Sequence, residues 1–243
     1  MSQISWAYVR NKIFSCKECL RLFPRVSVTN MRLDTYADPN SMARVKLLFV
    51  SEAPPGGQNL GSFFHIPQIQ DGLRRKLFAA LGQTAKLRGI DRLPNEEALQ
   101  FFLRSGLYLL PSFNFPCSKR EKQTGRILSK NANPTFGQLK HSSKHLCDEI
   151  TFIRPKMIFT LGKSALFTLL QGFRSTTGEA MKLDGAVTRT SKLEPIVGSK
   201  FQIDHGDQCE VWIENWPRIL SMKNHRFKQL VLDLRKVLDF GAS

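Results

Sequence analysis

Apolar runs of strand length alternate along this chain with stretches of helical character. Three runs are apolar almost throughout, at residues 45–50, 106–115 and 156–162, which is typical of strands buried on both faces of a parallel sheet. Five other stretches are predicted to be helices, over residues 5–23, 71–83, 95–106, 163–173 and 225–238. Strands and helices therefore follow one another along most of the chain.

The stretches between these elements are more polar. The basic segment 118–145 is predicted to be a solvent-exposed loop, and a helix or its tail follows at 147–155. Residues 193–220 hold short strand candidates separated by Gly, Asp and Asn, which indicates a hairpin leading into a last core strand. The sum predicts an α/β fold, a three-layer α/β/α sandwich around a mostly parallel central sheet.

Polar residues follow the carboxyl ends of the predicted strands. The stretch "LLFVSEAPPGG" (47–57) stops at a carboxylate, Glu52, and Asn114, Gly162 and the turn at 221–225 lie at corresponding places. In open α/β sheets, ligands bind beyond the carboxyl ends of the strands. The sequence therefore predicts one site at this edge of the sheet.

The chain is strongly basic, with 36 Lys and Arg against 20 Asp and Glu, a formal net charge of +16 and a pI near 10.0. The positive electrostatic field of such a chain favours polyanionic partners, although a generally basic composition without such a partner is the alternative. No apolar run is long enough to span a bilayer and no secretory signal is visible, so we expect an intracellular, cytoplasmic protein without a membrane partner. Five cysteines in that compartment indicate metal ligands or reactive thiols more than disulfides.

Three features together resemble the uracil-DNA glycosylase superfamily. "LLFVSEAPPGG" is similar to its first motif, and "RPKMIFTLGKSALFTLL" (154–170) is similar to its central strand and helix, in matching order and spacing. The third feature is a cysteine pattern that resembles the iron–sulfur branch, family 4 and its relatives. The cysteines at the corresponding places are Cys16, Cys19, Cys117 and Cys147.

This resemblance implies a single domain over residues 1–243, with inserts near 83–105, 119–143 and 175–210. It also implies a 4Fe–4S cluster on the four cysteines, while zinc, which thiolates bind equally well, is the alternative. The metal would staple the N-terminal helix to the sheet. Cys209 is left over and is interpreted as an ordinary thiol.

The implied activity is that of a monofunctional DNA glycosylase of base excision repair. As a monomer it would flip uracil or a related deaminated base out of DNA and hydrolyse its N-glycosidic bond. Breaking that bond develops a cation on the sugar and an anion on the base, so a carboxylate near the sugar favours the reaction. Glu52 is predicted to orient or deprotonate the attacking water, and a surface or capping carboxylate is the alternative.

Recognition of the base requires a stacking surface and a reader of its pairing edge. Phe64 is predicted to stack on the base, although a chain with 18 Phe must bury most of them. Asn114 can both donate and accept hydrogen bonds, and an ordinary turn asparagine is its alternative. Ser51 and Ala53, on either side of Glu52, complete the predicted base-binding set, with Ser51 standing where glycine is usual.

The last motif departs most from the superfamily pattern, because no His-Pro-Ser follows the last predicted strand. His225 is the candidate replacement, either to support the departing base or to contact a DNA phosphate. The predicted DNA-binding residues are Lys119, Arg120, Lys163, Lys223 and Arg226. Further basic residues that could follow a phosphate backbone are Lys122, Arg126, Lys130, Lys140, Lys144 and Lys228.

The missing His-Pro-Ser leaves a second hypothesis open. The chain would then be a catalytically degenerate, metal-stapled nucleic-acid-binding protein of the same fold.

Overall fold

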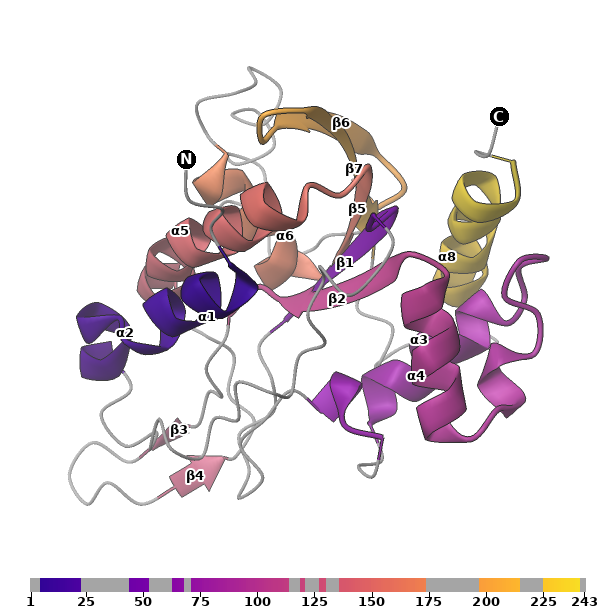
Figure 1. Cartoon of the computed structure of the whole chain (residues 1–243), viewed down its shortest axis with the longest axis horizontal. Helices are drawn as coiled ribbons and strands as arrows, with labels where there is room; N and C mark the ends of the chain where they lie inside the picture. The colour runs from indigo at the N-terminus through magenta and orange to yellow at the C-terminus, as the bar shows by residue number, and fades with distance from the viewer. Residues whose placement is uncertain are drawn as a thin grey trace.

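Five strands form one sheet at the centre of the protein (Figure 1). The computed structural model describes residues 5–22, 44–52, 63–67, 71–113, 119–120, 127–129, 136–173, 197–214 and 225–240. In spatial order the strands are β2 (Leu107–Pro111), β1 (Leu47–Ser51), β5 (Met157–Leu161), β7 (Gln208–Glu214) and β6 (Lys200–Asp204). The first four are parallel and β6 is antiparallel to β7, so the sheet is mostly parallel, as predicted.

Helices cover both faces of the sheet (Figure 1). One face is covered by α1 (Trp6–Phe14), α5 (Phe136–Ile153) and α6 (Lys163–Gly172), and the other by α3 (Gly72–Leu81), α4 (Asn95–Arg104) and α8 (His225–Arg235). Because successive side chains of a strand point to opposite faces, Leu48 and Val50 pack on the first layer, and Leu47 and Phe49 on the second. The predicted three-layer sandwich is confirmed.

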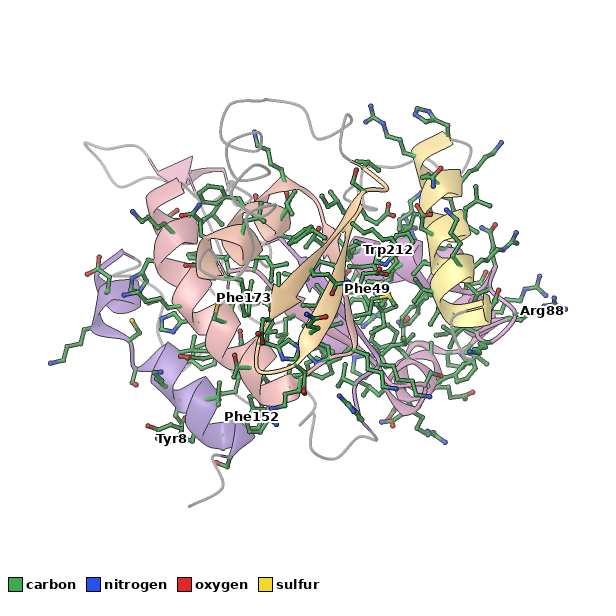
Figure 2. The ribbon with its side chains drawn as sticks, turned by 90° about the horizontal axis from the view of Figure 1, so that it is seen from above. Tyr8, Phe49, Arg88, Phe152, Phe173 and Trp212 are labelled. Carbon is green, nitrogen blue, oxygen red and sulfur yellow. The ribbon has the colours of Figure 1, made fainter. Side chains whose placement is uncertain are left out.

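Aromatic rings fill much of the layer under α3, α4 and α8. The rings of Phe159 and Trp212 are stacked with centroids 5.6 Å apart, and those of Phe49 and Phe102 with centroids 6.0 Å apart. Figure 2 shows Trp212 on the side of the sheet that faces α8, and Phe173 on the side of α5 and α6. Apolar packing on both faces thus holds the strand ends in place.

The remaining elements are shorter. They are α2 (Lys17–Leu22), η4 (Phe63–His65), η5 (Ile90–Arg92), the two-stranded sheet of β3 (Lys119–Arg120) and β4 (Ile127–Ser129), and η8 (Lys236–Phe240), which continues α8. Within the described ranges, no helix combines the length and the apolar character that crossing a membrane requires.

Helix α5 corrects the prediction of a loop over 118–145. The helix begins at Phe136. The sequence does not show it as a helix, because its buried face includes serines that interrupt the apolar spacing. The Ser142 hydroxyl donates a hydrogen bond to the Ser112 carbonyl (3.0 Å), and Ser143 donates to the Lys140 carbonyl (2.7 Å). Satisfied hydroxyls can be buried as apolar groups are, so the helix forms without a continuous apolar stripe.

Strands β6 and β7 form the hairpin predicted within 193–220. Their turn includes Gly206, whose φ of 103° lies in the left-handed region that favours glycine. Strand β7 is the fourth parallel strand and ends at Glu214. The later core strand predicted near 218–220 lies outside the described residues.

The connections leave β1 and β5 toward opposite faces. The chain after β1 enters α3 and α4 on one face before it returns as β2, whereas β5 leads directly into α6 on the other face. Since β1 and β5 are neighbours in the sheet, their carboxyl ends form a topological switch point. Such points are where α/β folds open a crevice for ligands.

A buried ion pair fastens α1 to α5. The guanidinium of Arg10 contacts the carboxylate of Glu149, and the two side chains are only 2% and 0% exposed. The same guanidinium lies over the ring of Phe14 (4.7 Å to the centroid) and near that of Trp6 (5.6 Å). The N-terminal segment is therefore held by charge as well as by apolar contact.

We expect Arg10→Ala to lower the free energy of unfolding by about 3–5 kcal/mol, because it leaves the Glu149 carboxylate buried without its cation. The double variant Arg10→Met/Glu149→Leu should recover most of this loss, since neither charge is then buried. Urea unfolding of the three proteins checks both results. An Arg10→Ala variant as stable as the wild type would contradict this role.

Candidate functional site

Glu52 lies at the switch point, as the first residue after β1. Its half-buried carboxylate accepts a hydrogen bond from the Ser164 hydroxyl in the first turn of α6. Burial raises the pKa of Glu52 above its ordinary value, and the Ser164 hydrogen bond opposes part of that shift. The neighbouring ends of β1 and β5 thus place a partly desolvated carboxylate at the carboxyl edge of the sheet, where the sequence predicts a site.

The backbone at this edge is tightly arranged. Gly162, between β5 and α6, has a φ of 97°, and its N–H donates to the Glu214 carbonyl at 2.9 Å. A glycine here lets α6 begin directly at the strand end, which brings Ser164 to Glu52. Lys163, predicted to contact DNA, is the first residue of α6 at the same edge.

Ser51 is buried at the end of β1, with 3% of its surface exposed. Its hydroxyl donates to backbone carbonyls, those of Glu52 (3.2 Å) and Leu110 (3.4 Å). In this structure the hydroxyl therefore supports the strand end that carries Glu52. Ala53, its predicted partner in base binding, lies outside the described residues.

Phe64 packs into the layer of α3 and α4. Its ring meets those of Phe78 and Phe102 edge to face, with centroids 5.8 and 5.3 Å away, and it is 3% exposed. The arrangement is that of a core phenylalanine, the alternative weighed for it from the sequence. Stacking on a base would require the turn of Phe63–His65 to move.

Two residues that the sequence analysis missed hold this turn. The buried Arg74 guanidinium donates to the carbonyls of Phe64 (3.0 Å) and Ile66 (2.8 Å). His65 Nε2 donates to the Leu109 carbonyl (3.0 Å) on the outer strand β2, and burial lowers the pKa of His65 to about 4. The neutral imidazole thereby covers part of the open edge of the sheet.

His225 is exposed at the start of α8, eleven positions after β7 ends. Helix α8 packs on the face opposite α6, the helix that touches Glu52. Arg226 follows His225 in the same turn and is half-buried. Among the described residues, no hydrogen bond or ion pair joins the two predicted catalytic side chains, Glu52 and His225.

The other predicted site residues fall into two groups. Lys119 and Arg120, predicted to contact DNA, form strand β3. Asn114, Cys117 and Lys223 lie outside the described residues.

A second cluster lies on the face of α1 and α5. Cys16 stands between α1 and α2, Cys19 lies in α2, and His141 and His145 are one turn apart on α5. Their Sγ and imidazole nitrogen atoms all lie within 4.8 Å of one another, close enough to hold one metal ion. The prediction that Cys16 and Cys19 bind a metal is thus supported, with two histidine partners that the sequence analysis missed.

The distances in this cluster fit a tetrahedral centre. Cys16 Sγ lies 3.3 Å from His141 Nε2, and Cys19 Sγ lies 3.4 Å from His145 Nε2. Metal–sulfur bonds of about 2.3 Å and metal–nitrogen bonds of about 2.0–2.1 Å at tetrahedral angles place sulfur and nitrogen roughly 3.6 Å apart. Small shifts of the side chains would therefore admit an ion.

Burial favours the neutral forms of Cys19 and His145 when no metal is bound. It raises the pKa of the Cys19 thiol far above its ordinary value and lowers the pKa of His145 to about 4, with a further lowering from His141. Neutral imidazole is the form that ligates metal, whereas the thiol must first lose its proton. Metal binding at this cluster therefore releases protons.

Cys147, a predicted cysteine ligand, is not among the described residues whose donor atoms converge in this group. It lies two positions after His145, so the helical repeat turns its side chain away from the cluster. Its Sγ sits against Gly172, where an added Cβ would come within 2.2 Å. Cys209 is fully buried in the core, as its interpretation as an ordinary thiol allows.

The two histidines carry a sequence signal, "HSSKH", which places them one helical turn apart. The spacing has this meaning only in a helix, whereas the sequence pattern predicts a loop for this segment. No known protein-family profile matches the chain, and no curated protein matches it either.

Proposed function

We propose that this protein is a monofunctional DNA glycosylase that hydrolyses the N-glycosidic bond of uracil or a related deaminated base. The observation that carries the proposal is the position of Glu52, a partly desolvated carboxylate at the switch point of a parallel sheet, held by Ser164. The resemblance of the segments around Glu52 and β5 to the uracil-DNA glycosylase superfamily and the basic charge support it.

In this mechanism the Glu52 carboxylate accepts a proton from the attacking water and faces the cation that forms on the sugar. Its ionised form is required, because only a carboxylate can do both. Ser164 helps by donating a hydrogen bond to the ionised form, which fixes the direction of the free oxygen. The flipped base would lie beyond the carboxyl ends of β1 and β5.

The metal centre is best assigned as structural zinc. Two thiolates and two imidazoles form the Cys₂His₂ set of structural zinc sites, whereas a 4Fe–4S cluster is held by four thiolates. Four protein ligands leave no open position for a substrate. The ion would fasten α2 to α5 rather than take part in the reaction.

A catalytically degenerate nucleic-acid-binding protein is the second candidate. Two observations favour it, namely the burial of Phe64 in the core and the position of His225 on a helix of the opposite face. Under this candidate the fold, the metal and the basic surface would remain and base excision would be absent.

We expect the purified protein to release the base from oligonucleotides that carry uracil, hypoxanthine or xanthine, as single strands or duplexes. Each excision leaves an abasic site, which alkali converts into a strand break visible on a denaturing gel. An identical strand without a deaminated base is the control. No product from any substrate would remove the glycosylase proposal and leave the binding protein.

A further inference from the structure

An open groove of about 910 Å³ runs beside the metal ligands. Three segments line it, namely α1 with Lys12, α5 with Lys140 and Lys144, and the end of α6 with Gln171. Three of the candidate metal ligands, Cys16, His141 and His145, also line the groove. The groove therefore lies between the parts of the chain that the metal joins.

The charge of the groove is positive. Asp148 is the carboxylate among its lining residues, and it is 2.7 Å from Lys12 Nζ, so these two charges offset each other. Lys140 and Lys144 are exposed one turn apart on α5, and no carboxylate within the described ranges forms an ion pair with either. Two ammonium groups thus project from one wall.

The helical repeat couples these lysines to the metal. Each lysine directly precedes a candidate metal ligand, His141 or His145, so the lysines and these ligands lie on adjoining faces of the same helical turns. The opposite wall, α1, is held to α5 by the metal ligands that follow it and by the Arg10–Glu149 ion pair. A bound metal would thus add a second tie between two walls of the groove.

The third wall is fixed by close packing. Gly172 of α6 lies so near α5 that an added Cβ would come within 2.2 Å of Cys147 Sγ and 3.0 Å of the Ser143 carbonyl oxygen. A glycine is needed for this approach. Loss of the metal would thus loosen the α1 wall and leave the α6 wall in place.

We propose that this groove binds the phosphate backbone of a nucleic acid, with Lys140 and Lys144 as its contacts, and that the metal centre is required for it. Exposed lysines along an open groove suit the repeated charges of a polymer, and the net charge of +16 attracts one. The choice of DNA as the polymer rests on the proposed function. The groove would be a DNA-contacting surface that does not include Glu52, on the face of α5 that carries the metal ligands.

The test is the salt dependence of binding to a short, undamaged DNA duplex, followed by fluorescence anisotropy. Removing two phosphate contacts with Lys140→Ala/Lys144→Ala should lower the slope of log K against log salt by about 1.8 and weaken binding about tenfold at low salt. Zinc content and thermal unfolding should match the wild type, because both side chains are exposed. Lys140→Arg/Lys144→Arg should restore binding.

Lys86→Ala/Arg88→Ala is the matched control, since both side chains are exposed beyond α3, and Figure 2 shows Arg88 at the end of the molecule opposite Tyr8 of α1. Its slope should equal that of the wild type. His141→Ala, which removes a metal ligand, should lower the slope of log K against log salt by the same amount as Lys140→Ala/Lys144→Ala. The triple variant should show no further decrease in this slope.

An unchanged slope in Lys140→Ala/Lys144→Ala would overturn the proposal, as would full binding by a metal-free His141→Ala protein. Excision of uracil is measured in parallel on the same variants. Normal excision with an unchanged slope overturns the groove alone. A reduced slope in a protein that excises no base supports the groove and removes only the glycosylase.

Discussion

Glu52→Gln should reduce base excision by about 10²–10⁴-fold while DNA binding and thermal stability stay close to those of the wild type. The amide keeps the shape of the side chain but cannot accept a proton from water or offset a cation on the sugar. Single-turnover release of the base from a uracil-containing strand measures the effect. Because burial raises the pKa of Glu52, the wild-type rate should rise with pH as this carboxyl ionises, and the variant should lose that rise.

The matched control is Glu97→Gln, which makes the same change at an exposed position of α4. It should retain wild-type excision. Ser164→Ala should have an intermediate effect, since it removes the hydrogen bond that orients the carboxylate. A Glu52→Gln protein with an undiminished rate would show that the catalytic group lies elsewhere.

Cys19→Ser should abolish metal binding and lower the Tm by roughly 10 °C or more. Structural zinc contributes several kcal/mol to folding, and each kcal/mol shifts the Tm of a chain of this size by about 2–4 °C. Metal analysis of the wild type should find one zinc per chain and no iron or sulfide. Chelation of the wild-type metal should lower the Tm similarly, which separates loss of the metal from the burial of a serine.

Two further variants distinguish the ligand sets. His141→Ala should lose the metal, because its half-buried imidazole lies 3.3 Å from Cys16 Sγ. Cys147→Ser should keep the metal, because its sulfur packs against Gly172. The opposite pattern, with iron and sulfide in the wild type, would restore the four-cysteine cluster that the sequence resemblance implied.

The sheet could be predicted because its strands carry their own signal. Strand β1 is buried throughout, and β5 is buried except for the half-buried Met157, and such strands are continuous apolar runs whatever surrounds them. Helix α5 could not be predicted in the same way. Its buried serines are satisfied by carbonyls such as that of Ser112, thirty positions away, and a local pattern contains no trace of that partner.

The candidate site was likewise predictable from the sequence only in part. Glu52 was predicted at a strand end, and the fold adds Ser164, which reaches it only because β1 and β5 are neighbours. Phe64 was chosen by its position in the chain, but Phe78 and Phe102 enclose its ring. Solvent exposure depends on all surrounding elements, so motif position alone does not predict it.

The amino-acid sequence is sufficient for the alternation of strands and helices, the basic charge and the carboxylate at a strand end, because each depends on the order of neighbouring residues. The tertiary structure alone joins Cys16 and Cys19 to His141 and His145 and turns Cys147 away. A metal site requires donors that converge within a few ångströms, and that convergence depends on how α2 packs against α5. The helical repeat of α5 then brings the lysines of the groove beside the two histidine ligands.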